Sequence, residues 1–371
     1  MAAESTTTGL GDIADPRRVS SFELFFDLVF VFALTQVTAS VAHDLTWSGL
    51  AHGLLILLVL WWAWGSYAWL TNAVPTEGGA RLVVLAAMAA MLVVALAVPT
   101  AFDGSGPAFA LAYLVVMALH TLLFAVAGER RLETRRAIAR LVPTNFTPAL
   151  VLLVAGYTSG SVQSGLWVVA VVLTYLGPYL VGVEGWQPDV PHFVERHALI
   201  LIIALGESIV AIGAGATGTV DLELATTALL AVALASGLWW AYFTGESEHA
   251  ESALAGVSGG RLPALARDLY SYLHIPLMLG IVLAALGIKL TLAHPDDTLP
   301  AVAAVAFCAG PALYFGALAA IRVRIAMRPH PAQLAAAVAA VAVIPLATEV
   351  SATAALIALA AITTTAAAVA R

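Results

Sequence analysis

The sequence predicts an all-α, polytopic membrane protein. Hydrophobic residues make up 61% of the 371 residues and charged residues 11%, whereas soluble domains carry about 45–50% apolar and about 25% charged residues. The apolar residues form continuous runs of about twenty, the length of a helix that crosses a bilayer. A soluble enzyme and a disordered chain are excluded because both need more polar residues, and a transmembrane β-barrel is excluded because its strands alternate.

About twelve transmembrane helices follow a polar start at residues 1–20, which we expect to be flexible and to carry no cleavable signal peptide. Pro143 and Pro148 interrupt the fifth helix, and for the alanine-rich last two a hairpin that does not span fully is an alternative. The expected helices are 22–43, 47–70, 80–101, 106–127, 137–157, 162–183, 196–217, 222–244, 265–290, 299–321, 332–348 and 350–370.

The positions of the basic residues predict the orientation of these helices. With twelve helices, fifteen arginines fall on one side of the membrane, and only Lys289 falls on the other. Short cytoplasmic loops carry an excess of basic residues. We therefore expect both termini to be cytoplasmic and the protein to lie in a bacterial inner membrane.

Three landmarks recur at an offset of about 180 positions and indicate an internal repeat. They are 61–64 with 239–242, Asp27 with Glu207, and 78–82 with 259–262. A repeat of six helices keeps its orientation, so the copies would be related by an axis along the membrane normal, as in many secondary transporters. We expect two six-helix halves, 21–185 and 186–371.

Glu23 and Asp27 lie four residues apart, on one face of the first helix. Two carboxylates at this spacing repel each other. They need a shared proton, a bound cation or an arginine. The sequence leaves open a cation or proton site and a structural pair held by Arg81 or another cytoplasmic arginine.

Glu207 lies near the middle of the seventh helix, where an ionisable group costs several kcal/mol unless it has a partner or a water-filled cavity. It is a candidate for proton coupling or substrate binding, and the alternative is a hydrogen bond that joins helices. At the start of the same helix, Glu195, Arg196 and His197 form a charged cluster that either supports the site or anchors the helix end.

His274 follows Arg267 and Tyr270 at helical spacing, which predicts one shared face with Asp268 pointing elsewhere. Pro276 is expected to weaken the helix beside this histidine, as in sites built from broken helices. His274 is therefore a candidate proton relay, and a histidine bonded to a neighbouring carboxylate is the alternative.

Tryptophans gather in the second helix, at Trp61, Trp62, Trp64 and Trp69. An aromatic belt at the membrane interface is the usual explanation, and a cavity for an apolar or cationic ligand is the alternative. The sequence contains no zinc-binding spacing, no P-loop and no dinucleotide fingerprint, so we expect no metal, no cofactor and no nucleic-acid partner.

Four segments resemble the bacterial low temperature requirement A protein family. They are ELFFDLVFVFALTQV, WWAW, ERHALILIIALGESIVAIG and RDLYSYLHIPLMLGIVLAALG. The resemblance runs from about residue 17 to the end and implies a multi-spanning bacterial inner-membrane protein. The family name describes a growth phenotype in the cold and gives no reaction. The residues that match its motifs are Glu23, Asp27, Glu195, Arg196, His197, Gly206, Glu207, Ser208 and His274.

We favour a secondary transporter coupled to protons or cations, in contact with the lipid bilayer and with a small-molecule or ion substrate. Its expected binding residues are Glu23, Asp27, Glu207, Ser208 and His274, supported by Arg81, Glu195, Arg196, His197, Arg267 and Tyr270. The alternatives are a lipid-handling membrane enzyme, with Glu207 and His274 as acid and base, and a non-catalytic sensor or scaffold for growth in the cold.

Overall fold

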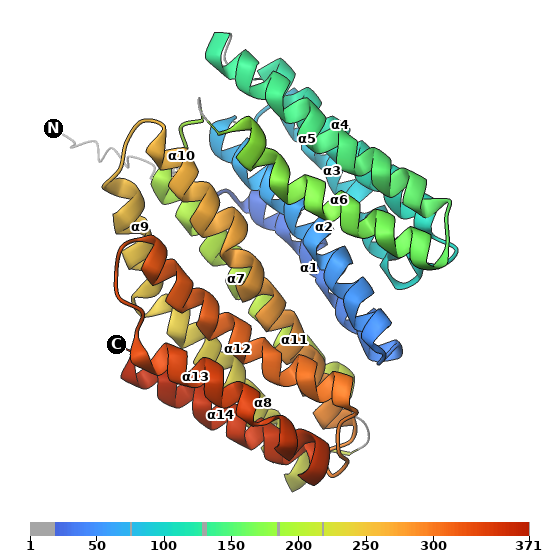
Figure 1. Ribbon diagram of the computed structural model, residues 1–371, viewed down its shortest axis with the longest axis vertical. Coiled ribbons are helices and arrows are strands. Elements are labelled where there is room, and N and C mark those ends of the chain that lie inside the picture. Colours follow the sequence, from blue (N-terminus) through green and yellow to red (C-terminus); the bar gives the residue numbers. More distant parts are fainter. Residues whose placement is uncertain (1–18, 75, 128–131, 184–185, 217–218, 371) are drawn as a thin grey trace, which may run out of the picture.

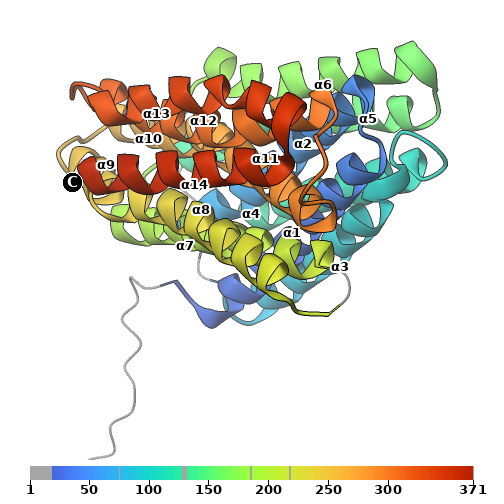
Figure 2. The same ribbon diagram turned by 90° about the horizontal axis from the view of Figure 1, so that it is seen from below.

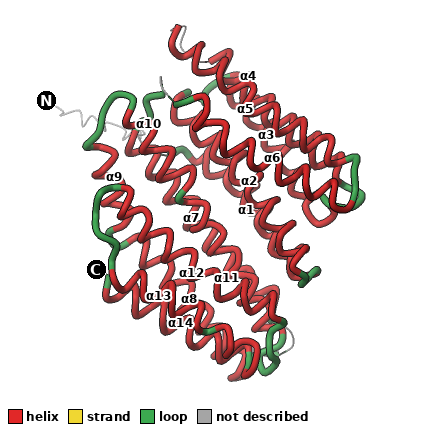
Figure 3. The backbone as a smooth tube through the Cα atoms, in the orientation of Figure 1, coloured by secondary structure: helices red, strands yellow, loops and turns green. Residues whose placement is uncertain are grey.

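The computed structural model describes residues 19–74, 76–127, 132–183, 186–216 and 219–370, and these residues fold into helices joined by loops (Figure 3). The first half contains α1 (Ser21–His43), α2 (Trp47–Ala73), α3 (Gly79–Ala97), η1 (Val98–Thr100), α4 (Gly106–Ala127), α5 (Leu132–Gly156) and α6 (Gly160–Val181). The second half contains α7 (Val190–Gly215), α8 (Leu222–Phe243), α9 (Glu246–Ala255), α10 (Arg261–Ala266), η2 (Arg267–Tyr272), α11 (His274–Ala293), α12 (Ala301–Arg324), α13 (Pro331–Ala342), η3 (Leu346–Val350) and α14 (Ala352–Val369).

The predicted multi-pass helical architecture is confirmed. Within the described ranges, eleven helical segments are long and apolar enough to cross a membrane. The exception among the expected spans is α5, which contains Pro143 and Pro148 and has a shorter apolar stretch, Val142–Gly156. The alanine-rich segments Pro331–Val350 and Ala352–Val369 both qualify by length and composition. Residues 1–18 of the predicted flexible start lie outside the described residues, as do Arg130 and Arg131.

The two halves form two groups of helices, α1 to α6 on one side and α7 to α14 on the other (Figure 1). Helices α1 and α2 contact α7 and α11 across the boundary. Equivalent neighbours pack within each group: α3 packs on α4 and α4 on α5, as α11 packs on α12 and α12 on α13. In the turned view, α14 lies beside α8, which it contacts (Figure 2). The matching contacts of α3, α4 and α5 with those of α11, α12 and α13 agree with a six-helix repeat. The repeat remains a prediction.

One of the three repeat landmarks does not match the positions along the helices. Asp27 lies in the second turn of α1, which begins at Ser21, whereas Glu207 lies in the fifth turn of α7, which begins at Val190. Asp27 and Glu207 are therefore at different heights in their helices. Arg196 is the residue of α7 at the height of Asp27.

Candidate functional site

A buried cluster of charged side chains joins α1 to α7 across the boundary between the halves. A nitrogen of the Arg196 guanidinium donates to the Asp27 carboxylate at 2.9 Å, and its other terminal nitrogen lies 3.4 Å from Glu23. Asp27 is 0% exposed, Arg196 1% and Glu23 5%. The arginine that the carboxylate pair requires is therefore Arg196, from the other half of the molecule.

Three further side chains complete this ion-pair cluster. His192 Nε2 donates to Glu23 at 3.2 Å, and Trp64 Nε1 on α2 donates to Asp27 at 2.8 Å. Asn72, also on α2, bonds His192 Nδ1 at 3.0 Å. The cluster thus links α1, α2 and α7, and each carboxylate accepts a hydrogen bond in addition to its contact with Arg196.

Local sequence places the two carboxylates in the first turns of α1. Ser20 caps the helix, and the Glu23 side chain accepts from the Ser20 backbone N–H at 2.9 Å in a capping box. Asp27 follows one turn later on the same face. His192 and Arg196 have the same four-residue spacing on α7, so two turns of each helix meet face to face.

Two atoms of the cluster, Asp27 Oδ2 and Arg196 Nε, are buried and contact no described residue by a hydrogen bond or an ion pair. Two more, Glu23 Oε1 and Arg196 Nη1, form the 3.4 Å ion pair without a hydrogen bond. A buried polar atom without a partner costs about 1–3 kcal/mol. One guanidinium thus offsets only one of the two carboxylate charges and leaves two buried polar atoms without a partner, which is unusual for a rigid structural ion pair.

Glu207 forms a second polar contact in the same interface, farther along both helices. The Thr35 hydroxyl of α1 donates to Glu207 at 2.6 Å, and Glu207 is 2% exposed. The neighbouring Ser208 hydroxyl is buried and bonds no described residue. Eleven residues separate Arg196 from Glu207, which is about 16 Å along an α-helix. The α1–α7 interface therefore holds two polar layers.

His274 lies in a third group, made mainly of aromatic rings. Its Nδ1 donates to the Leu269 carbonyl at 2.8 Å, and its Nε2 lies 3.0 Å from the Tyr242 hydroxyl. Tyr270 stacks on His274 with ring centroids 4.6 Å apart, and His197 lies 5.7 Å away. Both nitrogens of His274 are therefore occupied, by a tyrosine and a carbonyl and not by a carboxylate.

The expectation that Arg267 shares a face with Tyr270 and His274 is wrong, because Arg267 lies with Asp268, whose side chain contacts neither of them. The segment Arg267–Tyr272 is a π-helix, whose wider turn changes the direction of successive side chains. Arg267 donates twice to Asp268, at 2.9 and 2.7 Å, and once to the Pro178 carbonyl. Tyr270 and His274 instead face the aromatic group.

The other expected supporting residues lie outside these contacts. Arg81 is exposed and donates to the Thr76 carbonyl, so it is not the partner of Glu23 and Asp27. Glu195 accepts from the Val19 backbone N–H at 3.1 Å, which ties the chain before α1 to α7. Glu207 and His274 do not share a site, because His197, which packs near His274, is ten residues or about 15 Å from Glu207 along α7.

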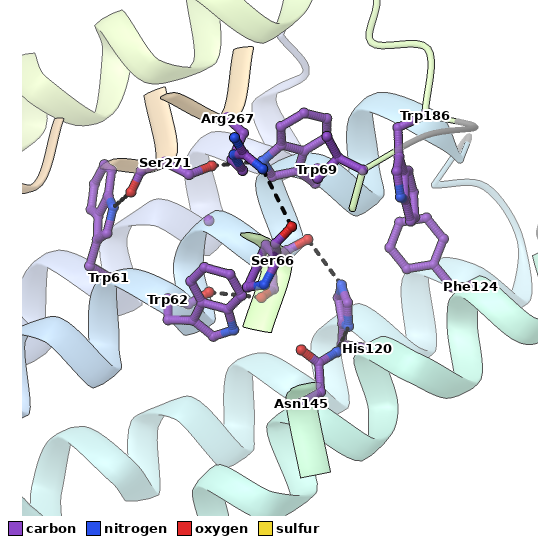
Figure 4. A pocket seen from close by; sticks show the side chains of 13 residues that line it. Trp61, Trp62, Ser66, Trp69, His120, Phe124, Asn145, Trp186, Arg267 and Ser271 are labelled. Carbon is purple, nitrogen blue, oxygen red and sulfur yellow. Dashed lines mark hydrogen bonds between the residues drawn. The ribbon is translucent and has the colours of Figure 1, made fainter. Parts of the chain in front are cut away.

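A cavity of about 80 Å³ opens between α2, α4, α5 and α6 and the π-helix η2 (Figure 4). Its aromatic wall consists of Trp61, Trp62, Trp69, Phe124 and Trp186. Trp61, Trp62 and Trp69 line the cavity, and Trp64 belongs to the ion-pair cluster.

Sequence reasoning missed His192, Thr35 and Tyr242, and it named Trp64 without predicting its bond to Asp27. For His192 a signal was present: a basic pair at i and i+4 in α7 mirrors the acidic pair at i and i+4 in α1. For Trp64, Thr35 and Tyr242 no local signal exists, because their partners lie on helices that the sequence alone does not place. In the part of the chain that the structure describes, no three histidine, cysteine or acidic side chains are grouped to hold a metal ion.

The sequence matches a known protein family over most of its length. The profile of the bacterial low temperature requirement A protein (LtrA) family matches residues 18–368. The chain belongs to this family. It is also similar to a protein of Rhizobium meliloti (strain 1021) of uncharacterized function, at 33% identity over 313 residues, 81% of this chain and 76% of the relative. No solved structure matches the chain significantly. The LtrA match covers both halves and all three groups of polar residues.

Proposed function

We propose that this LtrA-family membrane protein is a secondary transporter coupled to protons or cations, in which the α1–α7 interface opens and closes. The observation that supports this proposal is the buried ion-pair cluster, in which Arg196 of one half contacts Glu23 and Asp27 of the other. Asp27 Oδ2 and Arg196 Nε bond no described residue. Such contacts can separate and be hydrated in a second conformation.

In this proposal the two polar layers of the interface have different roles. The ion-pair cluster closes the end of the interface where α1 and α7 begin, which the arginine distribution predicts to be cytoplasmic. Glu207, bonded to Thr35 deeper in the interface, is the carboxyl that takes up a proton or cation when water reaches it. Ser208, whose hydroxyl has no described partner, lies beside it and supplies a further ligand.

A non-catalytic scaffold is the second candidate function. It is favoured by the observation that Glu23 and Asp27 are both paired with Arg196 in a packed interior. An enzyme that uses Glu207 and His274 as acid and base has less support, because these residues belong to separate groups of contacts. The transporter and the scaffold differ in whether the interface opens.

Opening can be measured with a single cysteine in the deeper layer. Cys308 is the only cysteine and is buried in α12, so Cys308→Ser gives a cysteine-free chain into which Ser208→Cys is introduced. We expect slow labelling of this cysteine by a membrane-impermeant maleimide from the side of the ion-pair cluster. Adding Arg196→Gln should raise the labelling rate at least about tenfold. Removing one partner of a buried ion pair shifts the equilibrium between the closed and open interface by more than ~1.4 kcal/mol.

The matched control is Arg196→Gln in the otherwise unchanged chain, where maleimide reports on Cys308. If Cys308 becomes reactive to the same extent, Arg196→Gln has loosened the whole fold and the cluster is structural. Unchanged labelling at both positions would support the scaffold and reject the transporter. Selective labelling of Ser208→Cys, from one face of the membrane only, is the outcome that the transporter requires.

A further inference from the structure

The aromatic cavity is separate from both polar layers of the α1–α7 interface. It lies mainly within the first half and is closed on one side by the π-helix η2 of the second half (Figure 4). Its volume of about 80 Å³ is several times the ~10–15 Å³ that a single water molecule needs by the same measure. That space suits a molecule of one ring or a short hydrocarbon chain.

The residues that line the cavity favour a ligand whose main part is apolar. Trp61, Trp62, Trp69, Phe124 and Trp186 present aromatic surface, which packs against flat or aliphatic groups. The polar side chains near the cavity bond mostly to protein: Asn145 Nδ2 lies 3.4 Å from His120 Nδ1, and His120 Nε2 donates to the Ser66 carbonyl at 3.1 Å. Water has few free partners in such a space.

Arg267 gives the cavity a positive edge. Its guanidinium has five N–H donors, of which three bond to Asp268 and to the Pro178 carbonyl. Asp268 is shared with Arg324, which donates to it at 2.9 and 2.8 Å, so two guanidinium groups and one carboxylate leave one net positive charge. No acidic side chain is among the described residues that line the cavity.

We infer that this cavity is a binding site for a small organic acid with an aromatic or short aliphatic body. The body stacks on the tryptophans, and the carboxylate accepts from the two remaining N–H groups of Arg267. An organic cation would meet the net positive charge of Arg267, Asp268 and Arg324 and would find no carboxylate among the described residues that line the cavity. This inference goes beyond the proposed function, because a scaffold and a transporter could each hold such a ligand.

Binding of benzoate to the purified full-length protein tests the inference. Radiolabelled benzoate is measured by scintillation proximity, with benzyl alcohol and benzylammonium as unlabelled competitors of the same ring size. We expect saturable benzoate binding, weaker competition by the alcohol and the weakest by the ammonium. Arg267→Gln should weaken benzoate binding about tenfold or more, because it removes a charge-assisted hydrogen bond, and should leave competition by benzyl alcohol nearly unchanged.

Substitutions at two glycines form a matched pair. They distinguish a variant that fills the cavity from one that only disturbs the fold. Gly65 lines the cavity, and a Cβ at this position meets no atom within 4 Å, so Gly65→Leu directs a side chain into the space. Gly165 on α6 also has open space around its Cβ but does not line the cavity. Benzoate binding should be lost in Gly65→Leu and retained in Gly165→Leu. Gly65→Ala serves as the smaller step if the leucine variant does not fold.

Three results would overturn the inference: no saturable benzoate binding to the unmodified protein, equal binding in Gly65→Leu, or stronger competition by benzylammonium than by benzyl alcohol. The maleimide experiment is unaffected by all three, since it needs no ligand. The experiments can therefore reject the proposed binding site in the cavity without rejecting the proposed transport function, and the reverse also holds.

Discussion

Asp27 has no exposed surface and Arg196 is 1% exposed, so each is the other's main source of charge compensation. Taking two such charges out of water is costly, and their attraction offsets this cost only while both are present. Trp64 adds a hydrogen bond to Asp27 but brings no charge. The stability of the boundary between the halves therefore depends on the pair as a unit.

We predict that Asp27→Asn lowers the free energy of unfolding by about 3–5 kcal/mol, because it leaves Arg196 buried without its closest carboxylate. The double variant Asp27→Asn with Arg196→Gln should be more stable than either single variant, and a double-mutant cycle from thermal unfolding in detergent measures this coupling. Asp103→Asn, at an exposed loop position, is the control and should change little. Additive effects of the two substitutions would contradict the pairing.

At the scale of one element, the π-helix η2 determines which side chains face the cavity and which face the aromatic group. A π-turn releases backbone carbonyls from the regular helical pattern. The Ser271 carbonyl accepts from Trp61 Nε1 at 3.0 Å, and the Leu269 carbonyl accepts from His274 Nδ1. Two side chains from different halves thus satisfy the carbonyls of this segment.

We predict that Trp61→Phe destabilises the protein by about 1–3 kcal/mol more than Trp62→Phe. Both substitutions exchange the same side chains at adjacent positions of α2. Trp61 Nε1 bonds the Ser271 carbonyl, which would be left buried without a donor, whereas Trp62 Nε1 bonds no described residue. Thermal unfolding of the two variants in one detergent measures the difference. Equal effects would show that the indole hydrogen bond does not stabilise η2.

At the scale of the whole molecule, α1 begins and α14 ends at the same end of the bundle (Figure 1). This agrees with an even number of crossings. The cytoplasmic location of that end is a prediction from the arginines and follows from no contact in the structure.

We predict that green fluorescent protein fused after Arg371 is fluorescent and that alkaline phosphatase at the same position is inactive, because green fluorescent protein folds in the cytoplasm and alkaline phosphatase outside it. Alkaline phosphatase inserted at Asp103, in the loop between α3 and α4, should be active. These two activities in whole bacterial cells report the orientation. The reverse pattern would place the ion-pair cluster at the outer end of the α1–α7 interface.

The sequence anticipated much of the fold and part of the site. Apolar runs located the helices because a spanning segment must satisfy its own backbone hydrogen bonds. Glu23, Asp27, Arg196 and Glu207 were identified because charges in such segments are costly. The shared face of Arg267 and His274 was predicted wrongly because the spacing rule assumes a regular α-helix, and the π-helix η2 breaks it.

Membrane class, helix positions and the presence of a polar α1–α7 pair of helices were thus determined by the sequence, since the bilayer constrains each helix independently of its neighbours. Only the tertiary structure decided that Arg196 and not Arg81 neutralises Asp27, that Glu207 bonds Thr35, and that Trp61, Trp62 and Trp69 enclose a cavity while Trp64 does not. Each of these contacts joins residues far apart in the chain, and its energy exists only once the helices have packed.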